Sequence, residues 1–264
     1  MRRRAGGLDV ADDAPMARAI VITVAIAGAV LLLAHGPIAQ PLDYHRYADA
    51  RTIAGIPHFW NVVSNLPFAL VAIFGLWWIA RPAQLDLLRR NRVMAIWVVL
   101  FAGEFLTCFG SAWYHAFPSS ATLVWDRLPF SLILTSFFSL AIAELVSPTG
   151  GRRMLVPMVT IGLASVVYWA WTDDLRPYAL VQFVPVVLIP ILALLSPGRL
   201  VPARYFLIAW LLYVAAKACE LQDESIYALT GFVSGHTLKH LLAAVASATP
   251  LTYLMSPKAT LPIR

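Results

Sequence analysis

Apolar runs of about 20 residues, separated by short polar connections, constrain this 264-residue chain more than any other feature. Such a run is long enough for a helix to cross the hydrocarbon core of a bilayer. Within lipid, every backbone N–H and C=O must be hydrogen-bonded inside the protein, so only helices and closed barrels are stable there. Continuous apolar runs favour helices, because barrel strands alternate between apolar and polar residues. The sequence therefore predicts an all-α integral membrane protein.

The composition supports this class of protein. Hydrophobic residues make up 60% of the chain, charged residues make up 13%, and the mean hydropathy is +0.73. Soluble domains contain about 25% charged residues. The net charge of +6 comes mainly from arginines in the short connections, a pattern that indicates membrane orientation and not nucleic-acid binding. Cys108 and Cys219 both lie in apolar runs, so no disulfide is expected.

Eight runs are predicted to span the membrane. We interpret the first run, residues 19–34, as an uncleaved helix; a cleaved signal peptide is the alternative, because residues 34–36 form a weak small-x-small site. The other seven runs are residues 60–80, 93–113, 123–146, 154–171, 178–195, 205–219 and 236–255. The chain is thus divided into an N-terminal segment with one extra helix (1–59), a seven-helix domain (60–255) and a tail (256–264).

The distribution of basic residues predicts the orientation of these spans. Fourteen of the 20 Lys and Arg residues fall on one side of the membrane, whereas only Arg46, Arg51 and Arg176 fall in the connections on the other side. Cytoplasmic loops carry the excess of basic residues. Both termini are therefore predicted to be cytoplasmic, and the long polar loop 36–59 is predicted to face the extracytoplasmic side.

The stretch Gly110–Phe130 places three polar side chains at or near membrane depth. Ser111 and His115 are four residues apart, so they share one face of a helix. Asp126 lies close to the start of the next span. Polar and ionisable groups at this depth are costly and usually functional. We therefore expect a functional site here, near the extracytoplasmic face.

The last span opens with a second pair at helical spacing, His236 and His240, at the same predicted depth as His115. Three imidazoles and one open position form the ligand set of a catalytic zinc site. Zinc lowers the pKa of a bound water molecule to about 7. Asp126 could orient that water or move its proton, and Ser111 could donate a hydrogen bond to a developing oxyanion.

Other interpretations of the same residues stay open at this point. Membrane histidines often only hydrogen-bond between helices. A haem would take two histidines from facing helices and would not need Ser111 or Asp126. Ser111 could also be a nucleophile, although no Gly-x-Ser-x-Gly elbow surrounds it. Glu104, two turns deeper than Ser111, either lines the pocket or forms structural hydrogen bonds.

Four motifs, in this order and at these helix ends, resemble the alkaline ceramidase family, which belongs to a seven-helix hydrolase superfamily that includes the progestin and adiponectin receptors. The resemblance covers roughly residues 41–255. Phe59–Asn65 reads FWNVVSN and is similar to the family's Phe-Trp-Asn-Thr-x-Ser-Asn. The other motifs are Ser111-x-x-x-His115, Asp126 eleven residues after His115, and His236-x-x-x-His240.

The resemblance implies a zinc-dependent enzyme of a bacterial inner membrane that hydrolyses the amide bond of ceramide or a ceramide-like lipid. The products would be a sphingoid base and a fatty acid. It implies that His115, His236 and His240 ligate zinc, while Ser111 and Asp126 assist hydrolysis. The alternatives are a seven-helix receptor or sensor with a structural zinc, and a hydrolase of a different membrane lipid.

One stretch departs from the family's pattern. Eukaryotic members carry an acidic, calcium-binding segment that ends in a Glu just before Phe-Trp-Asn. Here that position is His58, and Arg46 and Arg51 accompany Asp43 and Asp49. Because Ca²⁺ requires several oxygen ligands, the segment does not favour a calcium site, and the sequence leaves its presence open.

Overall fold

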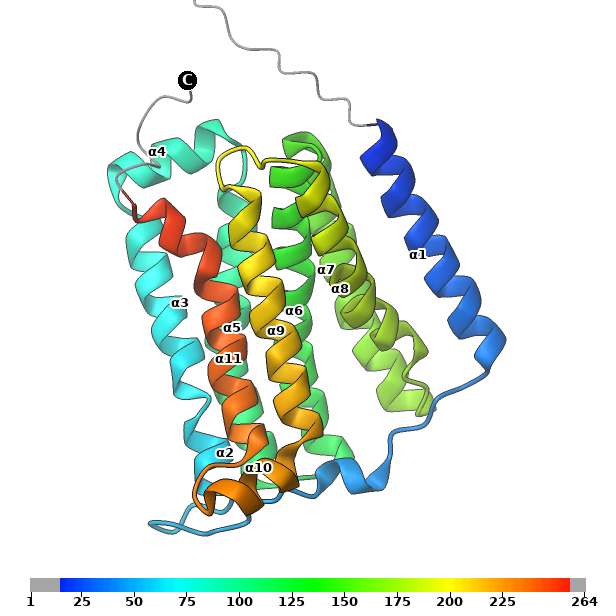
Figure 1. The fold of residues 1–264 in the computed structure, drawn as a ribbon, viewed down its shortest axis with the longest axis vertical. Helices are drawn as coiled ribbons and strands as arrows, with labels where there is room; N and C mark the ends of the chain where they lie inside the picture. Colours follow the sequence, from blue (N-terminus) through cyan, green and yellow to red (C-terminus); the bar gives the residue numbers. More distant parts are fainter. Residues whose placement is uncertain (1–14, 257–264) are drawn as a thin grey trace, which may run out of the picture.

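The computed structural model describes residues 15–256, and its long helices lie side by side in one bundle (Figure 1). No strand is present over this range, apart from two isolated bridges. The predicted all-α membrane class is therefore confirmed. The arginines before residue 15 and the tail after residue 256 lie outside the described residues.

The helices account for all of the predicted spans and add short elements between them. In chain order they are α1 (Pro15–His35), the 3-10 turn η1 (Leu42–His45), α2 (Phe59–Val63), α3 (Leu66–Ile79), α4 (Pro82–Arg90), α5 (Met94–Ala116), α6 (Ser120–Leu145), α7 (Pro148–Thr172), α8 (Arg176–Leu195), α9 (Ala203–Leu221), α10 (Asp223–Thr230) and α11 (Gly235–Leu254). The predicted second span is broken into α2 and α3. The sequence interpretation treated α4 and α10 as parts of connections.

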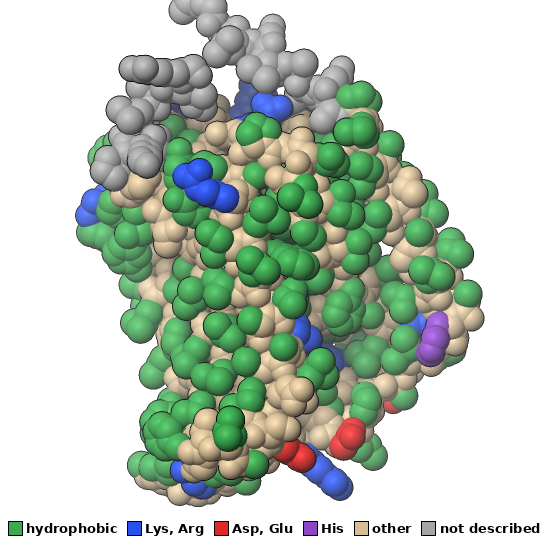
Figure 2. All heavy atoms as spheres, in the orientation of Figure 1, with side chains coloured by type: hydrophobic (Ala, Val, Ile, Leu, Met, Phe, Trp, Pro, Cys, Tyr) green, Lys and Arg blue, Asp and Glu red, His purple; other side chains and the backbone are tan. Residues whose placement is uncertain are grey.

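Six helices in the described range are long and apolar enough to cross a membrane, with α2 and α3 counted as one. The α9–α10 pair, bent by 79°, would make a seventh. The last helix, α11, runs beside α9 (Figure 1), but His236, Lys239 and His240 lower the hydropathy of its first turns. The sides of the bundle expose mainly hydrophobic side chains, as lipid contact requires (Figure 2).

The two ends of the bundle differ. The Pro15 end of α1, the helix α4 and the C-terminal end of α11 lie at one end (Figure 1). The elements η1, α2 and α10 lie at the opposite end, which we call the α10 end. Helix α1 packs mainly against α8 and leaves most of its surface exposed. Most of the buried core therefore lies among the helices that follow residue 58, and α1 adds Ala17 to it.

Serine caps determine where two of the important helices start. The Ser119 hydroxyl accepts a hydrogen bond from the backbone N–H of Thr122 at the start of α6. The Ser234 hydroxyl accepts one from the backbone N–H of Thr237 at the start of α11. Such caps satisfy N–H groups that have no partner within the helix. The histidine pair of α11 therefore lies within the first two turns of a capped helix.

Two glycines bring the site-bearing helices into close contact. A Cβ at Gly110 of α5 would lie 2.0 Å from the carbonyl oxygen of Trp125 in α6. A Cβ at Gly235 would lie 2.1 Å from the carbonyl oxygen of Cys219 in α9. No side chain fits at either position. Each glycine directly precedes a predicted site residue, so the two close contacts set the positions of Ser111 and His236.

Candidate metal centre

Three buried histidines meet near the α10 end of the bundle. His115 comes from the last turn of α5, and His236 and His240 come from the first turns of α11. One ring nitrogen of each lies within 4.8 Å of those of the other two. This is the only group of at least three His, Cys, Asp or Glu residues in the described chain with metal-binding geometry. The prediction that these histidines form one cluster is confirmed.

The spacing of the ring nitrogens fits a metal ion. His115 Nε2 and His240 Nε2 are 3.1 Å apart. Two nitrogens bound tetrahedrally to Zn²⁺ at about 2.0–2.1 Å lie roughly 3.3 Å from each other. His236 Nε2 is buried and has no hydrogen-bond partner. Since buried polar atoms in proteins normally have partners, an ion bound at the cluster would explain this orphaned nitrogen.

Ser64, in the break between α2 and α3, orients one of the three rings. Its hydroxyl lies 3.2 Å from the backbone oxygen of Asn61 and 2.8 Å from His240 Nδ1. A hydroxyl has a single proton to donate. When Ser64 donates that proton to Asn61, His240 donates its Nδ1–H to Ser64 and keeps the lone pair on Nε2. The lone pair then faces His115, as metal ligation requires.

The FWNVVSN segment also anchors the start of α11. Asn61 Oδ1 accepts hydrogen bonds from the hydroxyls of Thr237, at 3.0 Å, and Ser234, at 3.4 Å. Asn65 Nδ2 donates to the backbone oxygen of Asn61 at 2.8 Å. These contacts tie the α2–α3 break to the helix that carries two of the histidines. The polar residues of the FWNVVSN segment therefore hold the histidine-bearing start of α11 in place.

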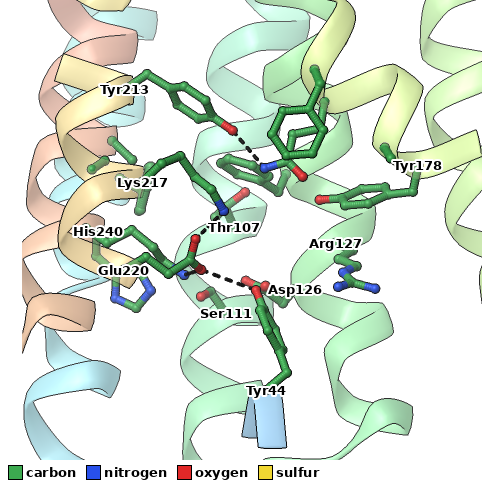
Figure 3. A pocket seen from close by; sticks show the side chains of 18 of the residues that line it. Tyr44, Thr107, Ser111, Asp126, Arg127, Tyr178, Tyr213, Lys217, Glu220 and His240 are labelled. Atoms are coloured by element: carbon green, nitrogen blue, oxygen red, sulfur yellow. Dashed lines mark hydrogen bonds and ion pairs between the residues drawn. The ribbon is translucent and has the colours of Figure 1, made fainter. Parts of the chain in front are cut away.

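Ser111 and Asp126 line a chamber beside the histidines. The cavity has a volume of about 170 Å³, and His240 forms part of its wall (Figure 3). Ser111 is buried on α5, one turn before His115, and Asp126 is in the second turn of α6. A ligand in this chamber can therefore contact a hydroxyl, a carboxylate and one face of the histidine cluster.

The chamber also contains an ion-pair network whose position the sequence did not reveal. Glu220 of α9 pairs with Lys217 and also with Lys239, at 2.9 Å. The Tyr44 hydroxyl, from η1, donates to Glu220 at 3.3 Å (Figure 3). Helical spacing indicates the contact between residues 217 and 220. The contact of Lys239 with Glu220 depends on the packing of α9 against α11. The contact of Tyr44 with Glu220 depends on the fold of the loop before α2.

The loop before α2 covers the histidines. The ring of Tyr47 lies with its centre 4.9 Å from that of His115 and 4.7 Å from that of His236. His45 hydrogen-bonds through its two ring nitrogens to Tyr114, at 3.0 Å, and to Ser120. Burial raises the pKa of Tyr47, so its hydroxyl keeps its proton at neutral pH. The loop thus closes the metal centre toward the α10 end.

Asp49 of the same loop forms an ion pair with Arg51. Arg51 donates to both carboxylate oxygens, at 2.8 and 2.7 Å. These hydrogen bonds lower the pKa of Asp49 below its ordinary value. Arg51 also donates to the backbone oxygen of Phe232, which ties the loop to the connection between α10 and α11.

A second, apolar cavity adjoins the chamber. It is about 70 Å³ in volume and is lined almost entirely by apolar side chains of α3, α6, α8, α9 and α11. The two cavities share wall residues, including Phe68, Phe130 and Ala243. We call this second cavity the apolar slot. Glu104, which the sequence placed either in the pocket or in structural bonding, lines neither the chamber nor the slot.

Comparison of the chain with protein-family models and with curated proteins gives no match. The resemblance to alkaline ceramidases therefore depends on the four motifs, and the structure adds the histidine cluster that three of the motif residues form.

Proposed function

We propose that this chain is a metal-dependent membrane hydrolase that cleaves the amide bond of a ceramide-like lipid. The observation that carries the proposal is the buried cluster of His115, His236 and His240, which reaches a chamber through His240; that chamber adjoins an apolar slot. A set of three histidines suits Zn²⁺ and leaves a position for substrate. The resemblance in sequence supports the same reaction.

The three histidines would hold the ion, and Ser111 and Asp126 would perform the proton and charge chemistry. Bound Zn²⁺ supplies Lewis acidity and makes water a better nucleophile near neutral pH. Asp126 accepts a proton from the attacking water at a carboxylate oxygen and returns it to the leaving nitrogen. Ser111 donates its hydroxyl hydrogen to the carbonyl oxygen as negative charge develops there.

The reaction consumes one water molecule. A bond forms between the water oxygen and the carbonyl carbon, and the bond between that carbon and the amide nitrogen breaks. The products are a carboxylic acid and an amine. A neutral amide is a weak electrophile, so both polarisation of the carbonyl and stabilisation of the oxyanion are needed.

The shape of the cavities supports a lipid as substrate. The polar chamber suits the amide and its neighbouring groups, and the apolar slot suits a hydrocarbon chain, because burying each CH₂ group contributes about 0.8 kcal/mol. The distribution of basic loops favours cytoplasmic termini and a site near the extracytoplasmic face of a bacterial inner membrane. The covering loop with Tyr47 would limit access of bulk water.

The test uses the purified full-length protein in detergent. His115→Ala and His236→Ala are expected to lose both bound zinc, measured by mass spectrometry of the metal, and release of fatty acid from ceramide. His35→Ala, at the exposed end of α1, is the matched control and should retain both. Hydrolysis at the original rate by either site variant would overturn the proposal. Stoichiometric zinc without turnover of any lipid amide would favour a receptor or sensor with a structural metal.

A further inference from the structure

Arg127, next to Asp126 on α6, is a buried cation that forms no ion pair with a carboxylate of the described residues. Its side chain lines the chamber, and the residue is only 6% exposed. Its Nη2 donates to Gln40 Oε1 at 2.6 Å. Its Nη1 is buried and has no hydrogen-bond acceptor among the described residues. The guanidinium packs over the rings of Trp169, at 4.2 Å, and Tyr178, at 4.9 Å.

An unpaired arginine is costly at this position. Arginine stays protonated in proteins, so it cannot escape the cost of burial by losing its charge. Aromatic rings and one amide oxygen offset only part of the lost hydration. Charged residues within a membrane protein usually face a partner, a ligand or a water-filled path. A negatively charged ligand in the chamber would supply the missing partner.

The carboxylates of the chamber wall form no ion pair with Arg127. The wall carries three cationic side chains, Arg127, Lys217 and Lys239, and two carboxylates, Asp126 and Glu220. Glu220 pairs with both lysines. Asp126 interacts electrostatically with Lys239 and Arg127 but forms no ion pair within 4 Å with either in the described chain, and it is assigned above to proton transfer. The walls therefore carry an excess of positive charge even before a metal cation is added.

The place of Arg127 in the fold suits a lipid headgroup. The side chain of Gln40 accepts the hydrogen bond from Arg127. The backbone N–H of Gln40 donates to the Asp173 carboxylate, in the connection between α7 and α8. Arg127 thus lies near the polar α10 end, whereas the apolar slot extends the chamber between the helices. A lipid whose chain fills the slot can hold its headgroup at Arg127. The planar guanidinium matches phosphate and carboxylate oxygens.

We propose that Arg127 binds a phosphate or carboxylate group of the substrate, so that the preferred substrates are N-acyl lipids with an acidic headgroup. This inference rests on the proposed hydrolase function and names its substrate class. It makes Arg127 a determinant of specificity that acts through binding. Neutral ceramide lacks the group that would pair with the guanidinium.

The test compares matched lipids on the wild-type protein and on three variants in neutral detergent. The lipids are N-palmitoyl sphingosine, its 1-phosphate and N-palmitoyl glycine, so that phosphate and carboxylate are separate arms. The variants are Arg127→Gln, Arg127→Lys and, as a matched control, Arg81→Gln. Arg81 also packs over tryptophan rings, at 4.0 and 4.3 Å, but lies outside the chamber.

Wild type and Arg81→Gln should hydrolyse at least one acidic lipid with kcat/KM about tenfold or more above that of the neutral lipid. Arg127→Gln should lose this preference, mainly through KM. Arg127→Lys should keep part of it, because the charge stays and the planar fork is lost. Equal or better use of the neutral lipid by wild type would overturn the inference, as would an unchanged preference in folded Arg127→Gln.

A binding experiment separates this inference from the hydrolase proposal. Hexadecyl phosphate and hexadecanol contain no amide bond, so an amidase cannot cleave either of them. Hexadecyl phosphate should raise the Tm of wild type by clearly more than hexadecanol does. In Arg127→Gln the two ligands should raise the Tm by similar amounts. If wild type cleaves no amide but shows this difference, the hydrolase proposal fails and the anion site stands. If both ligands act equally on wild type, the anion site is wrong.

Discussion

Ser64 Oγ lies 2.8 Å from His240 Nδ1, and this contact joins the break between α2 and α3 to the histidine cluster. The hydroxyl orients the ring from the side opposite to the nitrogen that faces His115. Partners of this kind hold a ligand in the tautomer that a metal needs. The serine of the FWNVVSN motif is therefore expected to orient His240, and this role can be measured.

Ser64→Ala is expected to weaken zinc binding by about 10- to 100-fold, because His240 loses the partner of its Nδ1–H. Competition with a chromophoric chelator measures this affinity without any enzymatic assay. Ser165→Ala is the matched control, since Ser165 is also buried and donates to a backbone oxygen, but lies on α7. Equal zinc affinity in wild type and Ser64→Ala would show that the serine does not orient the ligand.

Ser111→Ala and Asp126→Asn are expected to lower kcat for amide hydrolysis by about 10²–10³-fold while leaving bound zinc near the wild-type level. The reason is that these side chains are proposed to act on the substrate and not to hold the ion. Zinc content and fatty-acid release are measured on the same preparation. Unchanged turnover would remove these residues from the mechanism, whereas loss of zinc would assign them to the metal centre.

Gly110→Ala is expected to destabilise the protein by about 1–3 kcal/mol or more, because its Cβ would lie 2.0 Å from the Trp125 carbonyl oxygen. The same displacement should separate α5 from α6 and reduce hydrolysis. Gly28→Ala on α1 is the control: its Cβ would meet side-chain atoms of Leu180 and Val184 on α8 at 3.4 and 3.5 Å. Thermal unfolding in one detergent compares the two. A Tm of Gly110→Ala equal to that of wild type would contradict the close-packing argument.

Asp174, between α7 and α8, is expected to make stability depend on pH in acid. Arg176 donates to both of its oxygens, at 3.0 and 2.7 Å, and these hydrogen bonds lower the pKa of Asp174 from 3.8 to about 2. A carboxyl group with a lowered pKa stabilises the fold above its ordinary pKa, and this contribution is lost as the pH falls toward 2.

The stability difference between wild type and Asp174→Asn should therefore be largest above about pH 4 and shrink at lower pH. Denaturant unfolding at several pH values measures it. The exposed pair of Asp86 and Arg90 provides a control, since Asp86→Asn should change stability by less than about 1 kcal/mol. A difference for Asp174→Asn that stays constant down to pH 2 would show that the ion pair does not cause the effect.

Much of the site could be predicted because helical spacing and membrane depth are local properties. Four-residue spacing puts His236 and His240 on one face of α11, and the apolar runs with their basic loops place His115 at the same depth. Two residues could not be placed in this way. The spacing of Lys239 does not show which acid it meets, and Tyr44 belongs to a segment without helical periodicity; both contact Glu220 in the chamber.

The sequence by itself determined the all-α membrane class, the approximate helices and the grouping of the histidines near one end of the bundle, because apolar length and spacing act within single segments. Only the tertiary structure decided which helix faces meet. Rotation of a helix about its axis depends on close packing with its neighbours, as at Gly110 and Gly235, where a carbonyl of another helix occupies the space of a Cβ. That packing turns His115 toward His240 and leaves Arg127 in the chamber with no ion-pair partner among the described residues.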